Sequence, residues 1–204
     1  MRWLAAALAA LALPALAHDG VVHKTPEEAA AHAAAKAPTP GLPFPVDITA
    51  RFALTDHTGR AVTEKDYAGR TMAIFFGYAK CQAICSVAMP NLGAALEMLG
   101  DKADRVAPLL ITVDPARDTV EAMGPALAKW HPGLIGLTGS EDALADVRKA
   151  FQVERSKVMD DPETGPIYAH GSFIYLVGPD GKVQTLMPPI LGPERMAEII
   201  ASYL

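Results

Sequence analysis

The stretch "TMAIFFGYAKCQAIC", residues 71–85, places an apolar run directly before two cysteines. The run at 71–78 is continuous rather than alternating, as in a β-strand that is buried on both faces. Cys81 and Cys85 are the only cysteines of the chain. The stretch therefore predicts a central strand of an α/β domain, followed by two thiols that form a disulfide, act as a redox pair or bind a metal ion.

The segments after this strand predict a parallel crossover unit. Apolar residues at helical spacing lie between 88 and 99, and a second continuous apolar run occupies 106–114. A strand, a helix and a strand in this order form the parallel unit of α/β proteins. Other expected elements are a hairpin within 51–64, a helix within 119–130, a strand at 134–139, a helix at 141–151 capped by Ser140, a hairpin at 172–187 and a terminal helix opened by Pro193.

This order places the cysteines in the loop and first helical turn after a central strand. Ligands of open α/β sheets bind at the carboxyl ends of strands. Residues four apart share one face of a helix, so both sulfur atoms can point at one object. A helix N-terminus also favours thiolate over thiol. A disulfide here would close a ring too short to restrain much of the unfolded chain, so a purely structural bridge is disfavoured.

The N-terminal residues have the pattern of an export signal. Residues 1–17 contain Arg2, about a dozen apolar residues and a small-x-small cleavage pattern at 15–17. This apolar core is shorter than the roughly 20 residues that cross a bilayer, so an uncleaved anchor is the weaker alternative. Residues 18–45 predict a flexible Ala/Pro-rich tail, with a short helix capped by Thr25, and 46–204 a single domain. We expect a periplasmic protein without stable membrane insertion.

The charge balance argues against nucleic acid as a partner. The chain has 18 Lys and Arg residues against 23 Asp and Glu residues, a formal net charge of −5, and no basic run.

The metal chemistry depends on whether a histidine joins the cysteines. Two thiolates alone suit Cu(I), and a neutral imidazole as third ligand also allows Cu(II). Zn²⁺, held by the same residues and a water, is the second choice. Among the six histidines, His170 stands apart because it follows a polar loop, 156–168, and precedes a hydrophobic strand. Position alone leaves it open as a ligand, an exposed residue or a satisfied core residue.

Four segments resemble the Sco/SenC family in order and spacing. They are "FALTDHTGRAVTEKDYAGR" at 52–70, "IFFGYAKCQAIC" at 74–85, "ITVDPARDT" at 111–119 and "YAHGSFIYLVGPDGK" at 168–182. The resemblance implies a thioredoxin-like fold, a central mixed sheet flanked by helices with an inserted β-hairpin. It also implies a site for one copper ion per chain, Cu(I) or Cu(II), whose ligands are Cys81, Cys85 and His170.

Members of this family help to assemble the dinuclear copper centre of cytochrome c oxidase, as metallochaperones, as thiol reductants of its cysteines, or both. The implied partners are the copper-centre subunit of that oxidase or another copper protein, and other periplasmic copper carriers. A metallochaperone needs all three ligands and no turnover. A thiol-disulfide oxidoreductase needs only the cysteines. No motif supports a third class, a Cys–His peroxidase or acyl-transfer enzyme.

Several other residues are candidate accessories to this site. Lys80 adds a cation beside Cys81, which favours thiolate further. Asp114 is a turn or capping carboxylate, or a residue near the site that tunes it or contacts a partner. Met159 is an ordinary loop methionine or a soft extra ligand. Cleavage after Ala17 would also combine a free amine with three tail histidines, either as a Cu(II) site or as solvated side chains; these are His18, His23 and His32.

Overall fold

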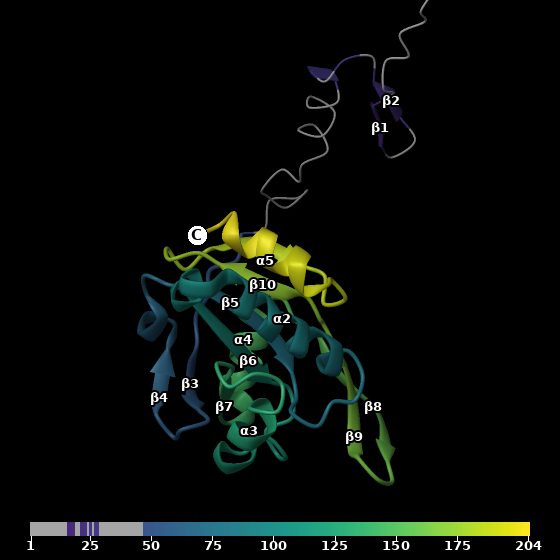
Figure 1. The fold of residues 1–204 in the computed structure, drawn as a ribbon. Helices are drawn as coiled ribbons and strands as arrows, with labels where there is room; N and C mark the ends of the chain where they lie inside the picture. Colours follow the sequence, from purple (N-terminus) through teal and green to yellow (C-terminus); the bar gives the residue numbers. More distant parts are fainter. Residues whose placement is uncertain (1–15, 19–20, 24, 26, 29–46) are drawn as a thin grey trace, which may run out of the picture. The chain divides into compact units, whose positions relative to one another are not determined.

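The computed structural model describes residues 16–18, 21–23, 25, 27–28 and 47–204, and the chain divides into two units, 1–39 and 40–204 (Figure 1). In the first unit, β1 (Leu16–His18) and β2 (Val21–His23) pair as antiparallel strands. The backbone N–H of Glu28 donates to Oγ1 of Thr25 at 3.1 Å, the contact expected of the predicted helix cap. The rest of the predicted signal and tail lies outside the described residues.

The second unit is built on one mixed sheet of seven strands (Figure 1). The three central strands are parallel, and each outer strand pairs antiparallel with its neighbour. In spatial order the strands are β11 (Val183–Met187), β10 (Ile174–Val177), β5 (Thr71–Gly77), β6 (Val106–Thr112), β7 (Ile135–Thr138), β3 (Ala53–Asp56) and β4 (Ala61–Thr63). The predicted α/β class, the parallel crossover unit and both predicted hairpins are confirmed.

The strands β5 and β6 lie at the centre of the sheet, and helices cover both of its faces there. Every residue of both strands is buried, and they pair from Thr71 with Val106 to Gly77 with Thr112. Successive side chains of a strand point to opposite faces. Phe76 packs edge-on against Phe151, at the end of α4 (Glu141–Ala150), with ring centroids 5.4 Å apart. Gly77, on the other face, lies against the start of α2 (Cys85–Leu99).

Two helices begin at the residues that the cap signals in the sequence predict. The Ser140 hydroxyl accepts from the backbone N–H of Ala143 and starts α4, and Pro193 is the first residue of α5 (Pro193–Ala201). The helix α3 (Val120–Leu127) begins after Thr119, whose side chain caps it. The helices α2 and α5 lie side by side over one face of the sheet (Figure 1). Among the described residues, none of the helices combines the length and hydropathy that a membrane span requires.

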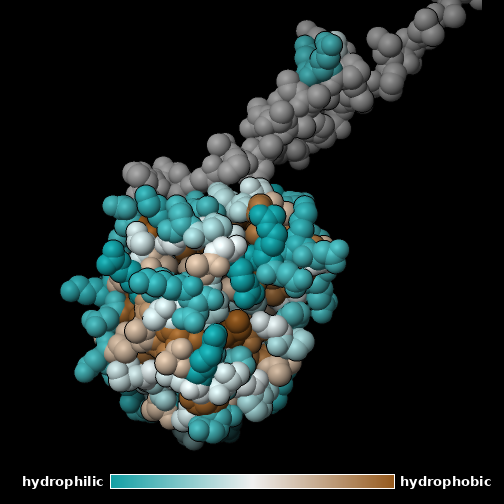
Figure 2. All heavy atoms as spheres, turned by 90° about the vertical axis from the view of Figure 1, so that its left-hand side faces the viewer, coloured by the Kyte–Doolittle hydropathy of each residue, from teal (hydrophilic) through white to brown (hydrophobic). Residues whose placement is uncertain are grey.

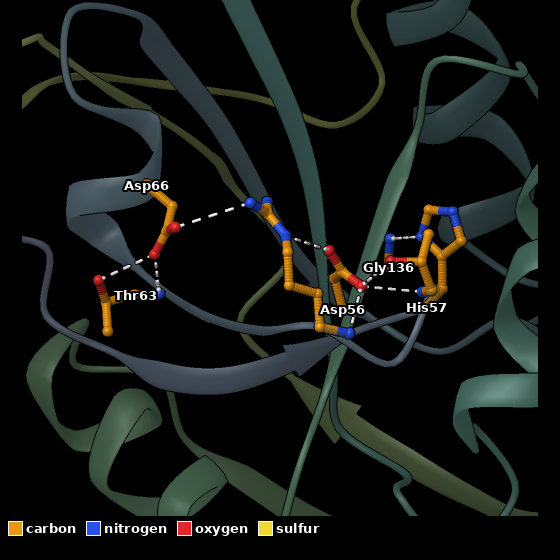
Figure 3. Close-up of polar contacts among 7 residues, drawn as sticks. Asp56, His57, Thr63, Asp66 and Gly136 are labelled. Atoms are coloured by element: carbon orange, nitrogen blue, oxygen red, sulfur yellow. Dashed lines mark hydrogen bonds and ion pairs between the residues drawn. The ribbon is translucent and has the colours of Figure 1, made fainter.

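The turn between β3 and β4 is fixed by polar contacts to the neighbouring strand (Figure 3). The backbone N–H of His57 donates to the Gly136 carbonyl at 2.9 Å, and the Gly136 N–H donates to Nδ1 of His57 at 3.0 Å. Asp56 accepts from Thr58 and from Arg60 within the turn. His57 therefore holds β3 against β7. Figure 2 shows the face that carries this edge, where hydrophilic side chains surround small apolar areas.

A second hairpin, outside the main sheet, consists of β8 (Arg155–Asp161) and β9 (Gly165–His170) (Figure 1). The prediction of a polar loop at 156–168 was wrong, because this segment forms the hairpin. β8 is mostly exposed and β9 mostly half-buried, and neither contains a fully buried residue, so their sequence lacks the alternation of apolar residues that marks a strand packed on a core. The turn is stabilised by Asp161, which accepts from the N–H groups of Glu163 and Thr164. Gly165 follows with a φ of +81°.

Candidate metal centre

The two cysteines lie at the carboxyl end of β5, as predicted, but only one of them belongs to a helix. Cys85 is the first residue of α2, whereas Cys81 lies in the loop before it, where its N–H donates to the Tyr78 carbonyl at 3.1 Å. The prediction that helical spacing aligns both sulfurs on one helix face is therefore wrong for Cys81. The loop brings the thiols together instead. Both are free and buried, with 5% of Cys81 and 0% of Cys85 exposed.

The two thiols differ in acidity because they share a hydrogen bond. The Cys85 thiol donates to the Cys81 sulfur, and this bond, with help from backbone N–H groups and the His170 imidazole and against the effect of burial, lowers the pKa of Cys81 to about 6. The same hydrogen bond and burial raise the pKa of Cys85. The predicted thiolate is therefore Cys81, with Cys85 as its proton donor. Lys80 is exposed and is not among the groups that lower this pKa most.

His170 is the last residue of β9, and aromatic side chains hold its ring. Its centroid lies 6.4 Å from that of Phe75 and 6.3 Å from that of Tyr78, both edge-on. Its Nδ1 is 3.0 Å from the Gly171 carbonyl oxygen. A carbonyl only accepts, so Nδ1 carries the proton and the lone pair of the neutral ring is on Nε2. The imidazole thus keeps one nitrogen available as a ligand.

The structure brings Cys81 and Cys85 into contact and His170 into electrostatic range of Cys81. Within the described part of the chain, no three histidine, cysteine or acidic side chains are gathered closely enough to hold a metal ion. The donor set nevertheless fits a soft metal, because it combines two sulfurs with a free Nε2. Glycine is required at position 77, because a Cβ there would lie 2.7 Å from the Phe75 ring and 3.1 Å from Sγ of Cys85.

The segment after β6 joins the cysteine loop to the hairpin that carries His170. Asp114, 1% exposed, forms an ion pair with Arg117. The Arg117 guanidinium also donates to the Thr164 carbonyl and, at 2.6 Å, to the Pro166 carbonyl in the hairpin. Its centre lies 5.4 Å from the Tyr78 ring centroid, next to the cysteine loop. Asp114 therefore acts through Arg117, whose role the sequence reasoning missed.

Asp118 fixes the loop that carries Cys81. Its carboxylate accepts from the N–H of Ala79 at 3.0 Å and from the Thr112 hydroxyl at 2.7 Å. Burial raises the pKa of Asp118, while these two hydrogen bonds oppose that rise. The only sequence signal for these roles is that "DPARD" concentrates three charges directly after a buried strand.

The remaining candidate residues are Met159 and the tail histidines. Met159 is in β8, opposite Ile167, and 53% of it is exposed. In the first unit, His18 and His23 belong to the paired strands β1 and β2. His32 lies outside the described residues, so the tail copper site stays a prediction.

A match to a family model places the chain among known proteins: residues 41–204 match the model described as SCO1/SenC. The chain is 35% identical over 155 residues to Protein sco1 of Schizosaccharomyces pombe, a match that covers 74% of this chain and 59% of that protein. It is 34% identical over 133 residues to the human SCO1 homolog, mitochondrial, covering 64% of this chain and 44% of that protein. The chain thus spans about half the length of these curated relatives.

Solved structures of Sco proteins are similar to this chain in fold. The structure of ScoI from Bradyrhizobium japonicum with copper bound has a TM-score of 0.71 and 34% identity, and the match covers 77% of this chain and 99% of that one. Yeast Sco1 with copper bound has a TM-score of 0.68 and 30% identity, covering 78% and 91%.

Proposed function

The chain belongs to the SCO1/SenC family, and we propose that it is a metallochaperone that holds one copper ion, as Cu(I) or Cu(II), through Cys81, Cys85 and His170. The observation that carries this proposal is the hydrogen-bonded pair of thiols, together with a histidine that keeps one nitrogen free and packs against Phe75 and Tyr78 at the end of β5. Sulfur donors favour Cu(I), and the imidazole extends the site to Cu(II). The copper-bound relatives support the choice of metal.

Copper is the cargo in this proposal, and each ligand has a distinct part. The Cys81 thiolate is ready to bind, because its pKa lies near 6. Cys85 is protonated, so it loses its proton when the metal enters. His170 approaches from β9, and Arg117 holds the turn of that hairpin against the segment after β6. Since the three side chains are not gathered closely enough to hold a metal ion, movement of the hairpin that carries His170 completes the ligand set.

We further propose that the copper passes to the copper centre of cytochrome c oxidase or to another copper protein, and that the chain works in the periplasm. The export pattern at 1–17 supports this location. The human relative is named as mitochondrial, whereas the Bradyrhizobium neighbour is bacterial, and the export pattern favours the bacterial setting.

Copper titration of the reduced protein under anaerobic conditions tests the proposed site. We expect one copper per chain, loss of tight Cu(I) binding in Cys81→Ser and Cys85→Ser, and, after mild oxidation, a Cu(II)–thiolate absorption band that disappears in His170→Ala. His131→Gln is the matched control, because His131 is a histidine outside the site and its Nδ1 accepts only from Gly133. Tight Cu(I) binding that persists in either cysteine variant refutes the proposal.

A second function, reduction of disulfides in a copper protein, is favoured by one observation. A thiolate with a lowered pKa beside a protonated thiol is the arrangement of a nucleophile and a resolving cysteine. Reductase activity that is unchanged in His170→Ala, in a protein that binds no copper, would make this the main function.

A further inference from the structure

The thiols are not equally accessible from outside. A pocket of about 470 Å³ opens beside the cysteine loop, and Cys81 lines it whereas Cys85 does not. Trp130 forms an apolar part of its wall. Any molecule that exchanges a ligand or a thiol with this centre through the pocket therefore meets Cys81 first.

Two lysines without ion-pair partners line the same pocket. Lys80 precedes Cys81, and Lys129 follows α3; both are exposed and neither forms an ion pair with any described residue. Other cationic side chains of this region, in contrast, form ion pairs with carboxylates. Arg117 pairs with Asp114, Arg155 with Glu141 at 2.7 Å, and Lys157 with Asp160 at 2.6 Å, all in and around the hairpin. The exposed Glu163 is the one carboxylate of this pocket's lining.

Apolar side chains are exposed at the same edge of the sheet. Val87 lies in the first turn of α2 and is 44% exposed, Phe173 directly before β10 is 46% exposed, and Ile190 after β11 is 73% exposed. Because β10 is antiparallel to β5 and β11 is antiparallel to β10, the start of β10 and the end of β11 lie beside the end of β5 (Figure 1). An edge that carries both a charged pocket and exposed apolar side chains is typical of a surface that binds protein.

We infer that this edge docks an acidic segment of the partner protein that exchanges copper with the chain, with Lys80 and Lys129 binding its carboxylates beside Cys81. The inference rests on the proposed function, and it adds the chemistry of the partner. The chain has a net charge of −5, so it repels an acidic protein in general. Two unpaired cations at the pocket mouth make this edge the favoured approach, which fixes the orientation of the complex.

The charge preference of the pocket can be measured without copper. The probes are three acetylated pentapeptide amides with a central cysteine, flanked on each side by two Glu, two Gln or two Lys residues and activated as the 2-pyridyl disulfide. The Cys81 thiolate attacks the peptide sulfur, a protein–peptide disulfide forms, and the departing pair of electrons leaves with pyridine-2-thione, whose absorbance gives the rate. Cys85 then displaces the peptide thiolate and closes the Cys81–Cys85 disulfide.

At low ionic strength we expect the reduced, metal-free chain to react about tenfold faster with the Glu peptide than with the Gln peptide, and more slowly still with the Lys peptide. Lys80→Gln and Lys129→Gln should each lower the Glu-to-Gln rate ratio about threefold, and the double variant should bring it close to one. Glu163→Gln should raise the ratio. The Gln peptide corrects for any change in thiolate fraction. Salt at about 1 M should abolish the preference.

Lys102→Gln is the matched control, because Lys102 is exposed and lies at the opposite end of the sheet, before β6. A ratio near one in the unmodified chain, a double variant that keeps the ratio, or an equal drop in Lys102→Gln refutes the inference. If the 2-pyridyl disulfide of glutathione reacts as fast as the Glu peptide, the pocket selects small anions and the protein partner is refuted.

Copper stoichiometry, measured separately, distinguishes the two proposals. The double lysine variant should still bind one copper per chain, since neither lysine is a ligand. A chain that prefers the Glu peptide but binds no copper would refute the proposed function and keep the docking surface. A chain that binds copper but shows no charge preference would keep the proposed function and refute the docking surface.

Discussion

Replacing Cys85 with alanine removes the hydrogen bond that does most to stabilise the Cys81 thiolate. Cys81 has its pKa lowered to about 6, and the Cys85 thiol is the largest cause. A hydrogen bond to a charged group contributes about 1.5–3 kcal/mol, and about 1.4 kcal/mol corresponds to one pKa unit. We therefore expect the pKa of Cys81 in Cys85→Ala to rise to about 7–8, with backbone N–H groups and His170 still favouring the thiolate.

The assay is the rate of alkylation by iodoacetamide as a function of pH, because only the thiolate reacts and Cys85→Ala leaves a single thiol. The midpoint of the pH profile should move upward by one to two pH units. Cys85→Ser is the matched variant: its hydroxyl still donates, so its midpoint should stay closer to 6. Cys81→Ala leaves only the fully buried Cys85, which should react slowly throughout. A midpoint near 6 in Cys85→Ala would refute the hydrogen-bond explanation and assign the lowered pKa to the backbone N–H groups and His170.

Three further predictions concern the elements that hold the site. Arg117→Met leaves the buried Asp114 carboxylate unpaired, so we expect a loss of about 3–5 kcal/mol in urea unfolding and faster amide exchange in the β8–β9 hairpin, whereas Lys157→Met, at an exposed pair, should cost less than about 1 kcal/mol. Gly165→Ala places a side chain at a φ of +81°, with its Cβ 3.0 Å from the Arg117 guanidinium. We expect it to lower the free energy of unfolding by about 1–2 kcal/mol and to weaken Cu(II) binding. An unchanged free energy of unfolding would show that the turn tolerates a side chain. Ser140→Ala should cost about 1 kcal/mol without any change in copper binding, since it removes only the cap of α4.

Local patterns in the sequence were sufficient for the main sheet and its helices. The runs at 71–78 and 106–114 are largely apolar because helices cover both faces of β5 and β6, and a continuous apolar run is visible in a short window of sequence. Ser140 and Pro193 marked helix starts because caps act on the first turn that follows them. Local patterns did not predict the hairpin β8–β9, because its strand residues are exposed or half-buried and none is fully buried.

The sequence by itself determined the α/β class, the order of the central elements and the position of both cysteines at the end of a strand, because each depends on neighbours along the chain. Resemblance, rather than pattern, selected His170 among six histidines. Only the tertiary structure decided which sulfur is the thiolate, that Arg117 joins Asp114 to the hairpin, and that Lys80 and Lys129 meet at one pocket beside Cys81. Arg117 and the hairpin, and Lys80 and Lys129, are separated by tens of positions along the chain, and the acidity of Cys81 depends on how the loop folds and is buried, so no local pattern encodes these properties.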